Sequence, residues 1–216
     1  MTGDRPSRSH AAATLKSCRI QKYEWEGLDM PLPSAKLRAL ASVNVGQPYL
    51  ILEAADSFDA LRAATLNLTG IDFLAVLGDC FRAKTFTKNN PGSVTRSLHK
   101  CGVAIDYNQG EKALVLVRES IDGRTYWHTY LKITDPAKQV DSEFVALRHL
   151  PVTQGGAFNG WALDFTELAA SMGWQRIPAQ KGWEKKGNWN KREFWHYQYS
   201  ALAGKGYDFL MGFLYD

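Results

Sequence analysis

The chain has 216 residues, of which 45% are hydrophobic and 22% are charged, and its formal net charge at pH 7 is +4. This length and composition are typical of a globular protein with one sizeable core, and they exclude a chain that is disordered throughout. The basic excess is too small to indicate a nucleic-acid partner, and we expect no membrane span because no stretch of about 18 apolar residues occurs. The three scattered cysteines predict free thiols, not a disulfide framework or a zinc knuckle.

We expect residues 1 to 45 to be an N-terminal extension that is partly disordered, and residues 46 to 216 to form the functional domain. A short helix is expected after Ser34, close to the end of the extension. A second helix is expected over residues 56 to 68, where Asp56 or Ser57 caps its start and Gly70 ends it.

The middle of the chain predicts extended structure. Residues 71 to 82 form an apolar run of strand length, and residues 87 to 97 have the composition of a loop. Two β-rich runs flank Asp122 and Gly123, which predicts a hairpin over residues 112 to 134.

The last third begins with a well-marked helix. Asp164 is its expected N-cap, Glu167 its capping-box partner, and Gly173 follows its end. An aromatic strand is expected over residues 193 to 202. Because no regular βαβ alternation occurs, the sequence predicts the α+β class, with a central antiparallel sheet flanked by helices.

The stretch "SLHKCGVAID" places His99 seven residues before Asp106. If residues 102 to 106 form a strand, then Gly102, Ala104 and Asp106 share one face, and the two small residues leave room beside the carboxylate for a bound ion. An imidazole and a carboxylate are suitable zinc ligands, and a catalytic zinc takes three protein ligands and a water. Spacing alone equally allows a hydrogen-bonded pair on the surface or in the core.

A third ligand has to come from the other four histidines. His10 lies in the polar tail, His128 suits a sheet surface, and His149 suits a cap or the core. His196 differs because Glu193 precedes it by three residues among large aromatic side chains. A carboxylate in such a partly dry site can serve as a general base.

Two patterns in these stretches resemble the signatures of one family, the zinc peptidases that include D-alanyl-D-alanine carboxypeptidases and phage L-alanyl-D-glutamate endopeptidases. The first signature, SxHxxGxAxD, is matched by Ser97, His99, Gly102, Ala104 and Asp106. The second, ExWH, is matched by Glu193, Trp195 and His196. The resemblance covers about residues 70 to 200 and implies a D-alanyl-D-alanine-carboxypeptidase-like core.

The resemblance implies that His99, Asp106 and His196 bind Zn²⁺ and that Glu193 is the catalytic base. In a straight strand, residues 193 and 196 face opposite sides, so we expect a bend between them or a strand that starts after Glu193.

Three further residues have two open roles each. Arg82 is similar to the family arginine that steadies the substrate, or it is an exposed loop residue. Ser97 contacts substrate or caps a loop, and Trp195 walls the pocket or belongs to the core. The loop over residues 182 to 192 either grips a wall polymer or is a solvated loop with two packing tryptophans.

Together these features predict a zinc-dependent peptidase that hydrolyses peptidoglycan stem peptides, as an endolysin-like L-alanyl-D-glutamate endopeptidase or a DD-carboxypeptidase. We expect a monomer that is made in the cytosol without a signal peptide, and that either acts on the cell wall after release or stays cytoplasmic. The alternatives are a non-catalytic zinc-containing module that binds a wall polymer or a protein, and a basic polymer-binding domain without metal.

Overall fold

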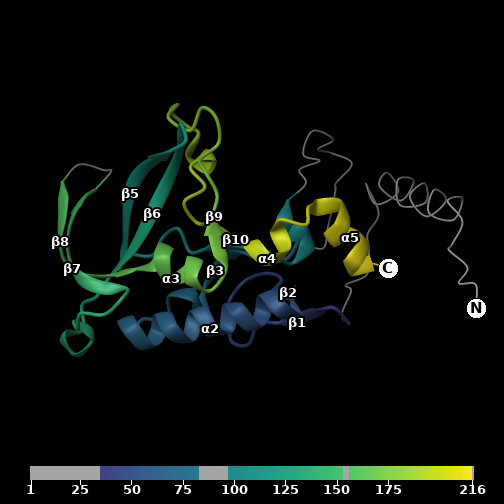
Figure 1. Ribbon diagram of the computed structural model, residues 1–216, viewed down its shortest axis with the longest axis horizontal. Coiled ribbons are helices and arrows are strands. Elements are labelled where there is room, and N and C mark those ends of the chain that lie inside the picture. Colours follow the sequence, from purple (N-terminus) through teal and green to yellow (C-terminus); the bar gives the residue numbers. More distant parts are fainter. Residues whose placement is uncertain (1–34, 83–96, 153–155, 216) are drawn as a thin grey trace, which may run out of the picture.

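The computed structural model describes residues 35–82, 97–152 and 156–215 (Figure 1). Within these residues the strands form three antiparallel sheets, with the orders β1-β2, β3-β4-β10-β9 and β5-β6-β8-β7. The strands are β1 (Leu37–Ala39), β2 (Tyr49–Ile51), β3 (Leu77–Asp79), β4 (Ala104–Tyr107), β5 (Leu114–Ile121), β6 (Arg124–Lys132), β7 (Val145–Pro151), β8 (Ala157–Asp164), β9 (Trp174–Arg176) and β10 (His196–Tyr199). The prediction of mixed helices and antiparallel strands is thus confirmed.

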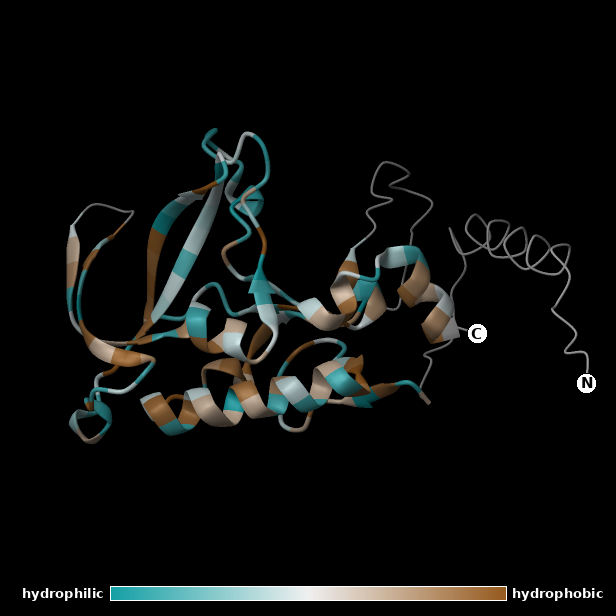
Figure 2. Cartoon of the chain, viewed as in Figure 1, coloured by the Kyte–Doolittle hydropathy of each residue, from teal (hydrophilic) through white to brown (hydrophobic). Residues whose placement is uncertain are grey.

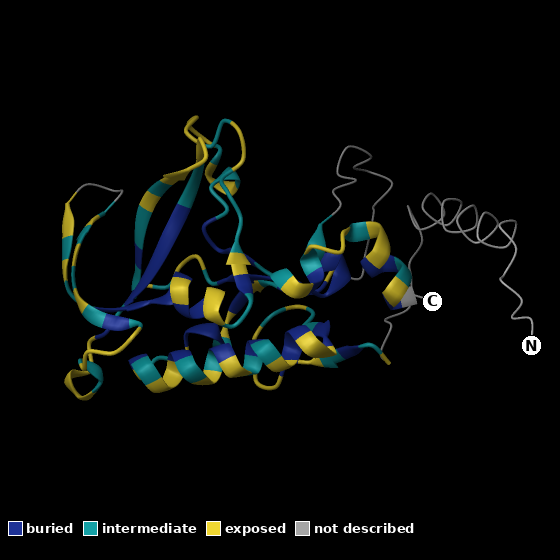
Figure 3. Ribbon diagram, in the orientation of Figure 1, coloured by how far each residue is buried: buried dark blue, intermediate teal, exposed yellow. Residues whose placement is uncertain are grey.

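Four α-helices accompany the sheets in the described part of the chain. They are α2 (Leu52–Thr69), α3 (Phe165–Ser171), α4 (Ser200–Ala203) and α5 (Tyr207–Tyr215). Hydrophilic and hydrophobic residues are mixed along α2 (Figure 2), and its buried side chains, such as Phe58, Leu61 and Thr65, recur every three or four residues. Buried residues are concentrated where the strands meet α2 and α3 (Figure 3), which creates the main core. No helix among the described residues is both long enough and apolar enough to cross a membrane.

The expected second helix exists, but it begins earlier than predicted. It starts at Leu52, directly after β2, and Ile51 in the N-cap position supplies no side-chain cap. Ser57 caps nothing, because its hydroxyl donates to the Met172 carbonyl at 2.6 Å. Gly70 ends the helix as predicted, in the left-handed conformation with φ 74°.

The prediction of a short helix after Ser34 is wrong. Residues Leu37–Ala39 form β1, which pairs with Tyr49–Ile51, and Leu40 is buried in the main core. Part of the expected N-terminal extension therefore packs on the rest of the chain, because a short isolated helix is only marginally stable, whereas pairing with β2 also buries Leu37 and Leu40.

The apolar run over residues 71 to 82 is only partly a strand. Its first half forms the 3₁₀ helix η1 (Phe73–Ala75), and the three-residue strand β3 follows. The loop expected over residues 87 to 97 lies outside the described residues except for its last residue.

The two elements with strong local signals are confirmed. Strands β5 and β6 form the expected hairpin, with Asp122 at φ 50° and Gly123 at φ 72° in its turn. The side chain of Asp164 accepts a hydrogen bond from the backbone N–H of Glu167 at 3.1 Å and caps α3.

In the described part of the chain, β6 pairs with β8 through three residue pairs, and the β5-β6 and β7-β8 hairpins diverge beyond that point (Figure 1). His128 of β6, expected on a sheet surface, is buried beside this junction. Its Nδ1 lies 2.9 Å from Glu119 Oε1 and its Nε2 lies 2.6 Å from Asp164 Oδ1. His149 is exposed on β7 and contacts Asn159, so it is neither a cap nor a core residue.

Candidate metal centre

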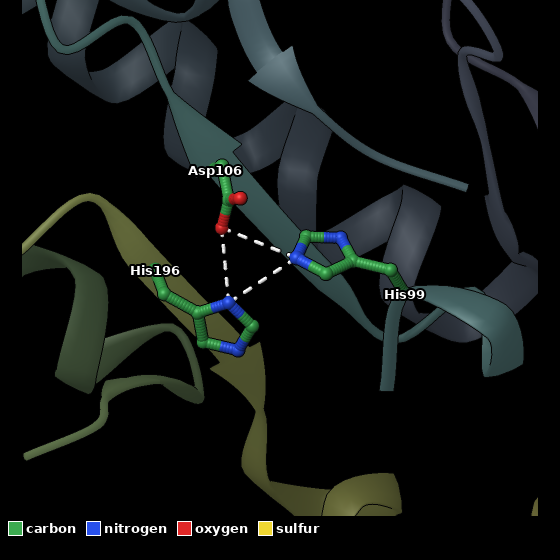
Figure 4. A group of neighbouring side chains, drawn as sticks. All are labelled: His99, Asp106 and His196. Atoms are coloured by element: carbon green, nitrogen blue, oxygen red, sulfur yellow. Dashed lines mark hydrogen bonds and ion pairs between the residues drawn. The ribbon is translucent and has the colours of Figure 1, made fainter. Parts of the chain in front are cut away.

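Three elements bring His99, Asp106 and His196 together (Figure 4). His99 lies in the 3₁₀ helix η2 (Leu98–Cys101), Asp106 lies in β4, and His196 is the first residue of β10. Strands β4 and β10 are antiparallel, and His196 is paired directly with Asp106. Directly opposed residues have their side chains on the same face of a sheet, so the strand register itself places the imidazole beside the carboxylate.

The three donor atoms form a small triangle. His99 Nε2 lies 3.1 Å from Asp106 Oδ1 and 3.2 Å from His196 Nδ1, and His196 Nδ1 lies 2.9 Å from Asp106 Oδ1. A tetrahedral zinc with bonds of about 2.0–2.1 Å requires its ligand atoms to be roughly 3.3–3.4 Å apart. The triangle therefore needs only a small expansion to hold such an ion, and all three side chains are buried.

The hydrogen bond on the far side of His99 determines which of its nitrogens carries a lone pair. His99 Nδ1 lies 2.7 Å from the Cys80 carbonyl oxygen, which can only accept, so Nδ1 carries the proton. The neutral ring then has its lone pair on Nε2, where a metal ion would take it, whereas the protonated ring donates from Nε2 to Asp106. A histidine that donates one N–H to a backbone carbonyl while its other nitrogen meets further donor atoms has the usual arrangement of a metal ligand.

The charge of Asp106 also suits a cation. Burial by itself would raise the pKa of Asp106, but the hydrogen bonds to His196 and His99 outweigh burial and hold the pKa well below its usual value. Asp106 is therefore a carboxylate at neutral pH, which is the form that binds a metal. The nitrogen and oxygen donors fit a divalent ion such as zinc.

Gly102 has a different role from the one expected. It precedes β4 with φ 65° and ends η2, and its carbonyl oxygen accepts a hydrogen bond from Ile51 N at 2.9 Å. A Cβ at this position would lie 2.9 Å from Leu37 Cδ2 and 3.1 Å from Ile51 N. The missing side chain therefore makes room for β1 and β2, and it does not make room for an ion beside Asp106.

Glu193 lies in the same cleft as the triangle. The cleft has a volume of about 430 Å³, and Arg82, Ser97, Gln180 and Gln198 also line it. The backbone N–H of His196 donates to the Glu193 carbonyl at 3.2 Å, and Glu193 has φ 57°, so the chain turns before β10 begins. This is the bend that the sequence predicted, and it allows both side chains to face the cleft.

The surroundings of Glu193 raise its proton affinity. Burial raises the pKa of Glu193, while the charge of His196 and a hydrogen bond from Gln180 Nε2 to Glu193 Oε1 only partly oppose this effect. A carboxylate with a raised pKa is a better proton acceptor near neutral pH.

The other expected site residues divide into two groups. Arg82 lines the cleft and forms an ion pair with Asp79, and its Nη2 lies 4.0 Å from Asp106 Oδ2. Ser97 also lines the cleft, and its side chain does not cap η2. Trp195 does not line this cleft; it is buried in the main core against Trp189 and Phe194. Of the two roles that the sequence left open, the structure therefore gives Trp195 the core role.

Two glutamines of the cleft were not anticipated. Gln198 follows His196 by two residues on β10, so strand periodicity could have placed it on the same face. Gln180 had no signal, because its contact with Glu193 depends on how the loop before β10 folds back.

No protein-family model matches this chain, and no curated protein or solved structure is significantly similar to it. The features of this chain that point to a function are therefore the geometry of the cleft and the two sequence patterns that converge there.

Proposed function

We propose that the chain is a zinc-dependent peptidase that hydrolyses peptide bonds in peptidoglycan stem peptides and has a D-alanyl-D-alanine-carboxypeptidase-like core. The observation that carries the proposal is the buried triangle of His99, Asp106 and His196 in one cleft with Glu193. The substrate class is supported by the sequence signatures in which these four residues occur.

In this proposal His99, Asp106 and His196 hold the ion. Three protein ligands leave one coordination position for water or substrate, as in catalytic zinc sites. When bound, zinc supplies a Lewis acid that polarises the scissile carbonyl and makes a water molecule acidic near neutral pH.

Glu193 moves the proton. Its Oε1 is held by Gln180, so we assign to Oε2 the removal of a proton from the attacking water and its delivery to the leaving amine. Burial raises the pKa of this carboxyl group, which makes it a stronger acceptor for the proton of the water. Gln180 fixes the orientation of the carboxylate, and its amide group is neither an acid nor a base near neutral pH.

Arg82 provides the positive charge at the cleft. Its guanidinium is oriented by Asp79, and it lies near the Asp106 carboxylate. A fixed cation here can bind a terminal carboxylate of the substrate or stabilise negative charge that develops on the scissile carbonyl oxygen.

The test is zinc content by elemental analysis together with mass spectrometry of digested muropeptides. Wild type is expected to hold about one zinc per chain and to cleave. Glu193→Gln is expected to keep the zinc and lose about 10²- to 10⁴-fold in rate, which is the usual contribution of a general acid or base. Glu143→Gln, at an exposed position, is the matched control and should behave as wild type.

The masses of the products distinguish an endopeptidase from a carboxypeptidase. Zinc binding by wild type without cleavage of any stem-peptide bond would replace the proposal with a non-catalytic zinc-binding module. Wild type without zinc would overturn the metal site itself.

A further inference from the structure

Glu193 has a backbone conformation that residues other than glycine rarely adopt. Its φ is 57°, and the two other non-glycine residues with positive φ in the described part of the chain, Ser42 and Asp122, lie in exposed turns. Glu193 is instead followed by Phe194 and Trp195, which are 2% and 5% exposed. Such a conformation costs free energy and persists only where the surrounding structure enforces it, so the contacts around Glu193 show what holds the segment.

Three consecutive backbone carbonyls of this segment accept hydrogen bonds. The carbonyl of Glu193 accepts from the N–H of His196 at 3.2 Å, which closes the turn. The carbonyl of Phe194 accepts from the hydroxyl of Tyr107 at 2.7 Å, and the carbonyl of Trp195 accepts from the backbone N–H of Tyr107 at 3.0 Å. One residue, Tyr107, therefore holds the two carbonyls that directly follow Glu193.

Tyr107 makes these contacts because of its place on β4. It directly follows Asp106, and successive side chains of a strand point to opposite faces, so Asp106 lines the cleft while Tyr107 enters the main core. Tyr107 is fully buried, and the centres of its ring and the Phe194 ring lie 6.2 Å apart. Its hydroxyl donates its one proton to the Phe194 carbonyl, so in the 3.0 Å contact with Thr129 the threonine hydroxyl is the donor. Both sides of the Tyr107 hydroxyl are therefore fixed.

We propose that Tyr107 is a positioning residue for Glu193, and that its hydroxyl keeps the chain in the turn that directs the Glu193 carboxylate into the cleft. The inference rests on the proposed role of Glu193 as the group that moves the proton. Without this hydroxyl the buried Phe194 carbonyl would lose its donor, and a buried acceptor without a partner is costly, so the segment would relax toward a less strained conformation. A carboxylate displaced by about 1 Å from its productive geometry loses much of its effect on the rate.

Tyr197 provides the matched control for a purely structural role. It is 1% exposed, its ring centre lies 5.9 Å from that of Tyr107, and its hydroxyl also contacts a threonine, Thr166, at 3.0 Å. Among the described residues, its hydroxyl forms no hydrogen bond with residues 193 to 195. Tyr107→Phe and Tyr197→Phe therefore each remove one buried hydroxyl from the same aromatic cluster, and only the first removes a bond to the segment that carries Glu193.

The kinetic test uses the full chain with zinc and a purified disaccharide pentapeptide, whose stem contains both the L-alanyl-D-glutamate bond and the D-alanyl-D-alanine bond. Tyr107→Phe should lower kcat roughly tenfold to a hundredfold, while KM and the zinc content stay as in wild type, because the carboxylate is displaced and the substrate contacts are not. Tyr197→Phe should keep the wild-type kcat. A wild-type kcat in Tyr107→Phe, a change in KM alone, or equal losses in both variants would overturn the proposal.

Amide hydrogen exchange followed by NMR tests the same contact without any substrate. The N–H of His196 closes the turn at Glu193, so its exchange should be slow in wild type and in Tyr197→Phe. In Tyr107→Phe it should be at least about tenfold faster, relative to amides of β6 that report global unfolding. Fast exchange of the His196 amide in wild type would show that the segment is not held, and it would overturn the proposal even if Tyr107→Phe does not fold.

The two measurements separate this inference from the proposed function. Wild type that holds zinc but cleaves neither bond would overturn the peptidase proposal, and the exchange rates alone would then decide whether Tyr107 holds the turn at Glu193. Cleavage by wild type, with kcat and exchange unchanged in Tyr107→Phe, would leave the peptidase proposal intact and overturn the role of Tyr107.

Discussion

Replacement of Gly102 by alanine should destabilise the protein strongly, for two reasons that can be separated. The residue has φ 65°, and a left-handed conformation costs a non-glycine residue roughly 1–2 kcal/mol. The new Cβ would also lie 2.9 Å from Leu37 Cδ2 and 3.1 Å from the backbone nitrogen of Ile51. Overpacking of this kind costs about 1–3 kcal/mol, so we expect a total loss of about 2–5 kcal/mol in the free energy of unfolding.

Gly123→Ala is the matched control for this substitution. Gly123 has φ 72° in the turn of the β5-β6 hairpin, and apart from its chain neighbours no described residue lies within 4 Å of the position that its Cβ would occupy. This variant should lose only the conformational contribution, roughly 1–2 kcal/mol. Denaturant unfolding followed by circular dichroism gives both free energies, and comparison of the slopes checks that the variants unfold in the same way.

The Gly102 substitution should also weaken metal binding. The N–H of Gly102 donates to the carbonyl of His99, so a shift of Gly102 moves the turn that carries this proposed ligand. Zinc titrations of both glycine variants would show the difference. If Gly102→Ala is no less stable than Gly123→Ala, the close approach of β2 does not have the cost inferred here, and the reasoning is refuted.

The remaining predictions concern buried side chains that titrate. Burial lowers the pKa of His128, but the hydrogen bond to Asp164 and the charges of Asp164 and Glu119 outweigh burial and raise the pKa above its usual value of 6.5. Protonated His128 therefore stabilises the folded protein fully below about pH 6.5, and this stabilisation is lost as pH rises through the raised pKa. In urea titrations, the difference in unfolding free energy between wild type and His128→Gln should therefore shrink at alkaline pH. A difference that is independent of pH would contradict this. Burial raises the pKa of Cys80 and of Cys101 to about 12, so iodoacetamide should label these two thiols only after unfolding, and peptide mass mapping that finds either one labelled in the folded protein would refute this.

Elements whose signals are local could be predicted from the sequence. The hairpin turn at Asp122 and Gly123 depends on two adjacent residues that accept positive φ, and the start of α3 depends on Asp164 and a backbone N–H three residues away. Neither signal needs information from elsewhere in the chain.

Elements that depend on distant partners could not be predicted from the sequence. The segment around Leu37 has spacing that suits a helix, yet it forms a strand because Tyr49–Ile51 lies beside it. Similarly, Ser57 is a good capping residue by type, but its hydroxyl bonds to Met172 from far along the chain. Tertiary contacts override local preference in both cases.

Only part of the candidate metal centre could be predicted from the sequence. The predicted convergence of His99, Asp106 and His196 matches the geometry, and the bend before His196 followed from strand periodicity. The carbonyl of Cys80 that orients His99 could not be predicted, because every residue has a carbonyl group and only the fold decides where it points. The contact between Gln180 and Glu193 has the same cause.

The direct pairing of His196 with Asp106 has a consequence for how the sheet forms. A slip of one residue between β4 and β10 would turn one of these two side chains to the opposite face, and the donor triangle would be lost. An ion that needs both strands therefore binds one strand register and rejects its slipped neighbours. Metal bound at the proposed site during refolding should therefore favour the native register of β4 and β10 over slipped registers.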